Sequence, residues 1–194
     1  MKIKLNLLIF LFFNLISNSS NRLQQKMMIF LLQEGDNLNI TQLLIFNLKA
    51  KYGNLVAASR HVGISAATLQ NWADSKSKPN MTHLNIISNT TKINASLWIS
   101  ENFLVLSSQS EYTETVCLHN YFRVNIDFYL RQTGKRRRDF VNQYNNSFID
   151  SMSPNTFDGY RSGRTVNIPL HRLEELSTFF NCEPNNLIEV RKHA

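Results

Sequence analysis

Residues 63–80 read GISAATLQNWADSKSKPN, and the spacing within this stretch predicts a tight turn followed by a short helix. Gly63 provides a position that adopts a positive φ without strain. Ser65 is a favourable N-cap for the helix, whose inward residues Leu69 and Trp72 lie about one turn apart. The stretch therefore predicts a glycine turn that leads into a helix with one apolar face and one small, polar face.

The residues before this turn predict two further helices of the same unit. A first helix starts near Thr41, and Gly53 followed by Asn54 provides a stop and an N-cap for the next helix. This second helix is expected over residues 55–62, with the small side chain of Ala58 on its inner side. Small residues there allow the following helix to cross closely, which is typical of a helix-turn-helix.

The second half of the chain repeats this pattern. At an offset of 88 residues, Ser65 matches Ser153, Thr68 matches Thr156, Leu69 matches Phe157 and Trp72 matches Tyr160. After one inserted residue the offset becomes 89, and Leu84 matches Leu173, Ile87 matches Leu176, Ser88 matches Ser177 and Ile93 matches Cys182. A register kept over some thirty residues indicates a tandem duplication.

On these residues both halves resemble the lambda-repressor-like (Cro/CI-type, also called XRE-type) helix-turn-helix DNA-binding domain. In the first half the pattern is carried by Ala58, Gly63, Ile64, Ser65, Thr68, Leu69, Trp72, Pro79, Leu84, Ile87 and Ile93. In the second half it is carried by Ser153, Thr156, Phe157, Tyr160, Gly163, Pro169, Leu173, Leu176 and Leu187. The resemblance covers nearly everything after residue 40. It implies an all-α fold of two tandem domains with about five helices each, over residues 29–106 and 113–194, joined by a polar linker at 107–112.

The resemblance also implies double-stranded DNA as the partner, with the helix after Ser65 lying in the major groove. The base-reading positions of the first half are then Ser65, Ala66, Ala67, Gln70 and Asn71. Gln and Asn side chains pair bidentately with adenine, and alanine contacts thymine methyl groups, so an A·T-rich half-site is expected. The alternative is that Gln70 and Asn71 are only solvated polar residues on a surface helix.

Contacts to the DNA backbone are expected from residues that flank the two reading helices. In the first half these are Asn54, Lys76, Lys78 and Asn80. In the second half they are Lys135, Arg136, Arg137, Arg138, Arg161 and Arg164. The alternatives are that the lysines only increase solubility and that residues 135–138 form a solvated helix start.

The second reading helix departs from the first at several positions. Its reading residues by position are Ser153, Pro154, Asn155 and Asp158. Pro154 suits the first turn of a helix, where its missing N–H is not needed. Ser151 stands where the first half has its turn glycine, so Asn145 and Asn146 are expected to form part of this loop. Asp158 and Gly159 are expected on the outward middle of the helix, which leaves open a second half that binds a protein instead of DNA.

The formal net charge of +7 and the sequence pI of about 9.6 suggest a polyanionic partner. Residues 1–28 contain four basic and no acidic residues, however, so any argument for nucleic acid depends on local patches. Cys117 and Cys182 lie far apart and are read as reduced thiols of a cytosolic protein. The sequence shows no metal-ligand cluster, phosphate-binding glycine loop or catalytic triad, so neither an enzyme nor a cofactor is expected.

Residues 1–28 combine two lysines with an apolar run of about a dozen residues. Three interpretations stay open: a cleaved secretory signal, a membrane tether that is short for a span, and a wrongly assigned start codon with translation beginning near Met27 or Met28. The last interpretation places the protein in the cytoplasm, associated with the nucleoid.

The leading functional hypothesis is a sequence-specific DNA-binding transcriptional regulator, a repressor of the prophage or mobile-element kind. The alternative is an antitoxin-like or adaptor-like module in which only the first half binds DNA and the second half binds a protein. A homodimer, the operator sequence and the direction of regulation stay open.

Overall fold

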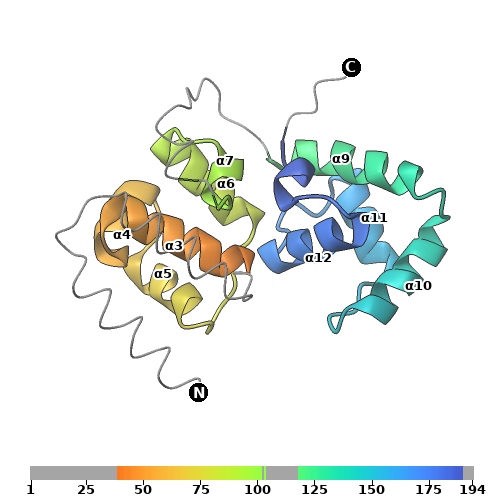
Figure 1. Ribbon diagram of the computed structural model, residues 1–194, viewed down its shortest axis with the longest axis horizontal. Coiled ribbons are helices and arrows are strands. Elements are labelled where there is room, and N and C mark those ends of the chain that lie inside the picture. The colour runs from red at the N-terminus through yellow and green to blue at the C-terminus, as the bar shows by residue number, and fades with distance from the viewer. Residues whose placement is uncertain (1–38, 102, 104–117, 190–194) are drawn as a thin grey trace.

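The computed structural model describes residues 39–101, 103 and 118–189 of the chain (Figure 1). The helices in chain order are α3 (Ile40–Tyr52), α4 (Leu55–Val62), α5 (Ala66–Ala73), α6 (Met81–Thr91), α7 (Ala95–Trp98), α9 (Leu118–Gln132), α10 (Arg137–Ser147), α11 (Pro154–Ser162), α12 (Leu170–Phe180) and the 3-10 helix η1 (Pro184–Leu187). The prediction of an all-α fold is confirmed for these residues. The expected leader, the linker at 107–112 and Cys117 lie outside them.

Short polar and glycine caps set the ends of the first helices. The Asn39 side chain accepts the backbone N–H of Gln42, and the Gln42 side chain accepts the backbone N–H of Asn39, both at 3.0 Å. Gly53 ends α3 with φ 84°, and Asn54 begins α4 by accepting a first-turn N–H at 2.8 Å. Gly63 ends α4 in the left-handed region with φ 69°. The ends at Gly53, Asn54 and Gly63 lie where the sequence predicts them, because each depends only on neighbouring residues.

Helices α5 and α11, which the sequence predicts to read bases, begin in the same way. Ser65 Oγ accepts the backbone N–H of Thr68 at 3.1 Å, and the two hydroxyl groups lie 2.8 Å apart. Ser153 Oγ accepts the backbone N–H of Thr156 at 3.0 Å, and these hydroxyl groups lie 2.9 Å apart. The offset of 88 residues found in the sequence therefore corresponds to a repeated helix N-terminus.

The later helices also correspond, now at an offset of 89. Helices α6 and α12 both end at a residue in the left-handed region, Lys92 with φ 58° and Asn181 with φ 52°. Buried side chains occupy matched positions in the two cores. At the offset of 88 these are Leu69 and Phe157, and Trp72 and Tyr160; at the offset of 89 they are Leu84 and Leu173, Ile87 and Leu176, Ser88 and Ser177, and Trp98 and Leu187. The repeat thus extends from local caps to packing.

The turn before α11 is longer than the turn before α5. Three residues, 63–65, separate α4 from α5, whereas six residues, 148–153, separate α10 from α11. No residue of 148–153 adopts a positive φ. Asn145 and Asn146, which the sequence predicts to form part of this loop, lie instead in the last turn of α10. The Asn145 side chain holds the turn from there, because it donates to Met152 O at 2.9 Å and accepts from Met152 N at 2.7 Å. The added length explains why Ser151 can stand in place of a glycine.

A buried arginine fixes the same turn from α12. Arg172 is 9% exposed, and its Nη1 donates to the backbone oxygen of Asp150 at 2.7 Å and to the Glu175 carboxylate at 3.0 Å. The Tyr144 hydroxyl group is hydrogen-bonded to both Arg172 and Glu175. Burial, which is the main cause, raises the pKa of Tyr144, so this hydroxyl remains protonated. The longer turn is therefore held by side chains from α10 and α12.

The expected outward position of Gly159 is wrong. Gly159 is buried, although its counterpart at the offset of 88, Asn71, is exposed. A Cβ atom at position 159 would lie 2.5 Å from Thr165 Oγ1, and Thr165 N donates to Gly159 O at 3.1 Å. The loop after α11 folds over this side of the helix, so glycine is required by a close approach that no local pattern reveals.

The two halves meet through a pair of reciprocal backbone hydrogen bonds. Met81 N donates to Ile168 O at 2.8 Å, and Leu170 N donates to Pro79 O at 3.1 Å, around an isolated antiparallel bridge between Asn80 and Pro169. At the offset of 89, Pro79 corresponds to Ile168, Asn80 to Pro169 and Met81 to Leu170. Helix packing is reciprocal too, since α3 packs against α12 and α6 packs against α9.

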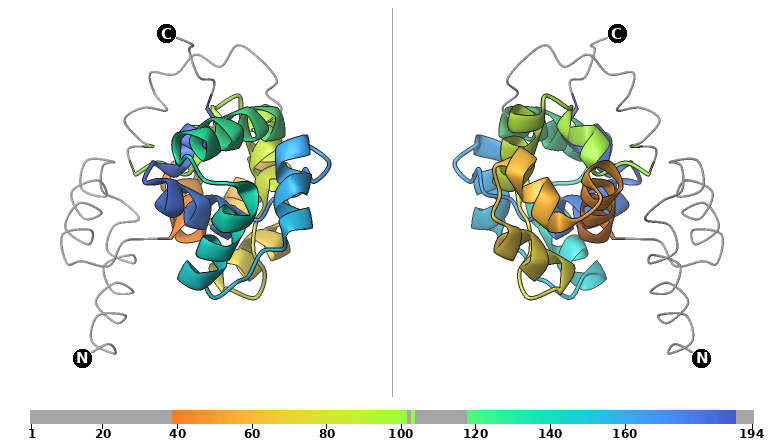
Figure 2. Two further views of the ribbon diagram at one scale, coloured as in Figure 1. Left: turned by 90° about the vertical axis from the view of Figure 1, so that its right-hand side faces the viewer. Right: turned by 90° about the vertical axis from the view of Figure 1, so that its left-hand side faces the viewer.

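Figure 1 shows the halves side by side, with α3–α7 on the left and α9–α12 on the right. The side views of Figure 2 place α9–α12 in front in one panel and α3–α7 in front in the other. Buried apolar side chains of both halves form one continuous cluster. The halves are therefore packed against each other, and not only connected along the chain.

Replacing Gly159 with alanine tests the close approach to Thr165. Alanine stabilises a helix interior by about 1 kcal/mol relative to glycine, but overpacking a core costs about 1–3 kcal/mol. We expect Gly159→Ala to lower the free energy of unfolding, measured by urea denaturation, in the wild-type background. In a Thr165→Ala background, which lacks the hydroxyl group, the same change should raise it. The same sign in both backgrounds would contradict the assignment.

Candidate nucleic-acid interface

The exposed face of α5 carries most of the predicted base-reading residues. Ala67, Gln70 and Asn71 are exposed and Ala66 is half-buried, whereas Leu69 and Trp72 on the opposite face are buried. Ser65, the N-cap, is also exposed. The spacing of residues 66, 67, 70 and 71 places them on one side of the helix. The structure therefore brings the predicted set together on a single accessible surface.

Gln70 is not free on this surface. Its Nε2 donates to Asp74 Oδ1 at 2.7 Å, one helical turn away, and Lys76 Nζ lies 3.0 Å from Asp74 Oδ2. The hydrogen bond from Lys76, followed by that from Gln70, lowers the pKa of Asp74. Reasoning from the sequence missed this chain of contacts, although the i,i+4 spacing of Gln70 and Asp74 is a signal for it. The contact orients the Gln70 amide and leaves its oxygen to accept.

The predicted backbone-contact residues of the first half have structural roles as well. Asn54 is exposed and caps α4, while the Asn80 side chain accepts the backbone N–H of His83 at 3.0 Å and caps α6. Lys78 Nζ lies 3.9 Å from Asp150 of the second half. Exposed ion pairs of this kind contribute about 0–1 kcal/mol, so Lys78 can leave its partner at little cost.

Helix α11 presents a smaller polar surface than α5. Ser153, Pro154 and Asn155 are exposed, and Pro154 occupies the first turn of α11 as predicted. Asp158 is only half exposed and pairs with Arg137, which comes from α10. Arg161 pairs with Asp127 and lies 4.0 Å from Asp158. Asp158 is therefore neutralised by arginines within its own half.

The four residues of the basic run at 135–138 differ in the contacts that they make. Lys135 donates to Gln143, and its ammonium lies 5.4 Å from the centre of the Phe179 ring. Arg136 and Arg138 are exposed, and Arg136 stands at the N-cap of α10. Arg164 donates to Ser162 at 3.0 Å. Arg136 and Arg138 are thus exposed members of the run that take no part in the Arg137–Asp158 pair.

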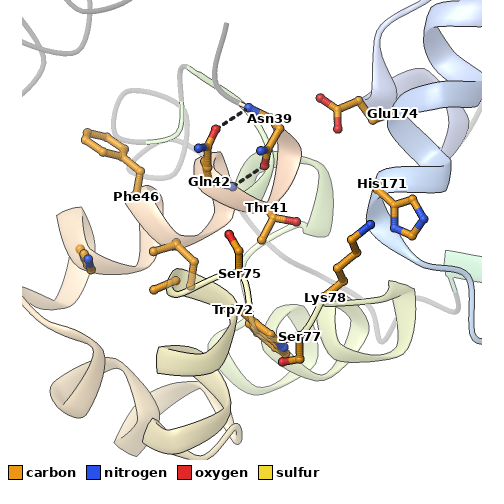
Figure 3. A pocket seen from close by; sticks show the side chains of 13 residues that line it. Asn39, Thr41, Gln42, Phe46, Trp72, Ser75, Ser77, Lys78, His171 and Glu174 are labelled. Carbon is orange, nitrogen blue, oxygen red and sulfur yellow. Dashed lines mark hydrogen bonds between the residues drawn. The ribbon is translucent and has the colours of Figure 1, made fainter. Parts of the chain in front are cut away.

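A hollow of about 530 Å³ lies between α3, the end of α5 with the loop that follows it, and helix α12 (Figure 3). Phe46 and Trp72 line it, together with polar side chains that include Lys78, His171 and Glu174. Figure 3 shows Lys78 pointing toward His171 across the hollow. Burial raises the pKa of Glu174, whose carboxylate accepts a backbone N–H of α3. Ser75 and Ser77 also line the hollow.

The comparisons with known proteins identify no relative: no protein-family model, no curated protein and no solved structure matches the chain. In the part of the chain that the structure describes, no group of three or more His, Cys, Asp or Glu residues is arranged to hold a metal ion. None of the helices in that part has the length and apolar character needed to cross a membrane.

Protonation of His83 should weaken the junction between the halves. Burial lowers the pKa of His83, and its Nδ1 accepts the backbone N–H of Asn80 at 3.3 Å beside the interhalf bridge. The unfolded chain therefore binds the proton more readily, and stability falls as the pH drops below about 6.5. His171, whose pKa is also lowered by burial, adds to the same slope.

We expect His83→Gln to flatten this pH dependence, because glutamine fills the same capping position in α3 without titrating. The measurement is the urea unfolding free energy at pH 7.5 and 5.5. His61→Gln is the control for loss of an imidazole elsewhere, at an exposed histidine in the last turn of α4 whose ring stacks on Tyr52. An H83Q slope equal to that of the wild type would show that His83 does not couple protonation to stability.

Proposed function

We propose that this protein is a sequence-specific DNA-binding transcriptional regulator built from two lambda-repressor-like helix-turn-helix units, a repressor of the prophage or mobile-element kind. The observation that carries the proposal is α5. It follows a three-residue glycine turn, starts at a serine cap and exposes Ala67, Gln70 and Asn71 on one side. A short helix with small residues at its N-terminus and amides one turn later suits the major groove. Such a regulator acts in the cytoplasm, associated with the nucleoid.

Two physical properties of this face support reading by α5. Small side chains at positions 66 and 67 allow the helix to approach the base edges closely, and each bidentate amide–adenine pair contributes about 1–3 kcal/mol of discrimination. The helix N-terminus with its free N–H groups favours a phosphate beside Ser65. Asp74 opposes phosphate binding by its charge, but Lys76 compensates it at 3.0 Å.

A narrower variant of this function is favoured by α11. Gly159 is buried where α5 exposes Asn71, and Asp158 is engaged by Arg137. The second half could therefore use its surface for a protein, as an antitoxin-like or adaptor-like module, while the first half alone reads DNA. Direct phosphate contact by Arg136 and Arg138 distinguishes the two variants.

Removal of the amides on α5 tests base reading. Binding-site selection with the purified chain should return an A·T-rich site, and a G·C-rich consensus would contradict the assignment. On the selected duplex, Gln70→Ala or Asn71→Ala should weaken binding by about 1–3 kcal/mol and relax the preference at one base position. Fluorescence anisotropy measures both effects. Asn186→Ala removes an exposed amide from η1 and is the matched control, with affinity unchanged.

Charge reversal tests the second half. If Arg136 and Arg138 contact phosphates, then replacing both with glutamate lowers the affinity for all sequences, and the dependence of log K on log[salt] becomes flatter by about one per lost contact. Unchanged affinity and salt dependence would instead support the protein-binding variant. Asp158 and Arg137 are left intact, so the ion pair at α11 is not disturbed.

A further inference from the structure

The contact between the halves has the form of an interface between two identical subunits. Met81 donates to Ile168 and Leu170 donates to Pro79, so each half provides the same donor and the same acceptor. The packing of α3 against α12 is likewise matched by the packing of α9, which corresponds to α3, against α6, which corresponds to α12. In an interface with two-fold symmetry, a contact from residue i to residue j is always accompanied by its reverse. An approximate two-fold axis therefore passes through the bridge at Asn80 and Pro169.

This axis determines how the two reading helices lie. A two-fold rotation exchanges α5 with α11 and keeps both at the same level along the axis. It also reverses their direction across the axis, so their capped N-termini occupy equivalent positions. Two reading helices related in this way match two half-sites in inverted order on one duplex, because protein symmetry and operator symmetry correspond.

The surface that forms this interface is buried between the two halves of the single chain. Met81 is 1% exposed, Ile168 1% and Leu170 0%, and Pro79 is buried as well. These residues are not available to a second copy. The homodimer that the sequence leaves open is thus not needed to bring two reading helices together.

We propose that a single copy of this chain is the complete DNA-reading unit, and that it occupies one site composed of two inverted half-sites with different sequences. The proposal rests on the DNA-binding function proposed above. Its basis is the reciprocal interface between the halves, which fixes both reading helices in one rigid body.

The half-sites differ because the two helices present different groups. Helix α5 offers the Gln70 and Asn71 amides, whereas α11 offers Asn155 and lacks a second outward amide, because Asn71 corresponds to Gly159, which has no side chain. Asp158 is engaged by Arg137 and does not accept freely from a base. The half-site under α5 therefore tolerates fewer substitutions than the half-site under α11.

The test uses the full chain and a duplex obtained by binding-site selection, with particle masses determined by native mass spectrometry. We expect one chain per duplex, and a selected sequence with two inverted, unequal halves. Two chains per duplex overturn the single-copy unit while leaving DNA binding intact. No binding to any duplex overturns the DNA-binding function and the reading unit with it. One chain on a site with a single half also overturns the proposal, since α11 then reads nothing.

A change of spacing in the DNA tests the rigidity of the pair without altering the protein. Inserting five base pairs between the half-sites turns one of them to the other side of the duplex, and affinity should fall about tenfold or more if α11 makes one good base contact. An insertion of half a helical turn that leaves the affinity unchanged would show that the halves act as independent modules, which contradicts the rigid unit. Substituting the half-site under α11 should lower affinity less than substituting the half-site under α5.

Discussion

The backbone bridge between the halves is the constraint on which the arrangement depends. Its donors, Met81 N and Leu170 N, belong to the first residues of α6 and α12, and first-turn N–H groups have no acceptor within their own helix. Both residues are buried, so water cannot satisfy these groups, and a buried donor left unpaired costs about 1–3 kcal/mol. Each half thus completes a helix end of the other, which couples their stability.

This coupling turns a repeat in the sequence into a pair of helices held in a fixed relation. Two tethered but independent domains would gain only effective concentration from their connection. A packed pair also fixes spacing and direction, which are the properties that determine the symmetry of a DNA site. As a consequence, both halves must keep the residues that form the bridge and the helix packing between them. The exposed residues of α5 and α11 are free to differ. The buried Gly159 and the paired Asp158 show that they do differ.

How much of this the sequence could predict depends on the range of each interaction. The caps at Asn54 and Ser65 and the first-turn position of Pro154 follow from neighbouring residues, and the sequence predicts them correctly. The burial of Gly159 depends on a loop that returns from outside the helix, so local spacing misplaces it. The Arg161–Asp127 pair joins α11 to α9, and nothing in the spacing along the chain indicates it. For the same reason, the exposed side of α5 could be predicted and the smaller surface of α11 could not.

Amide hydrogen exchange of Met81 and Leu170, followed by NMR on the full chain, tests the reciprocal bridge most directly. The account predicts that both amides are strongly protected and exchange with similar protection factors, because separation of the halves breaks the two hydrogen bonds together. Rapid exchange of either amide, at the rate of an unstructured peptide, would contradict the bridge and the paired arrangement of α5 and α11 that depends on it.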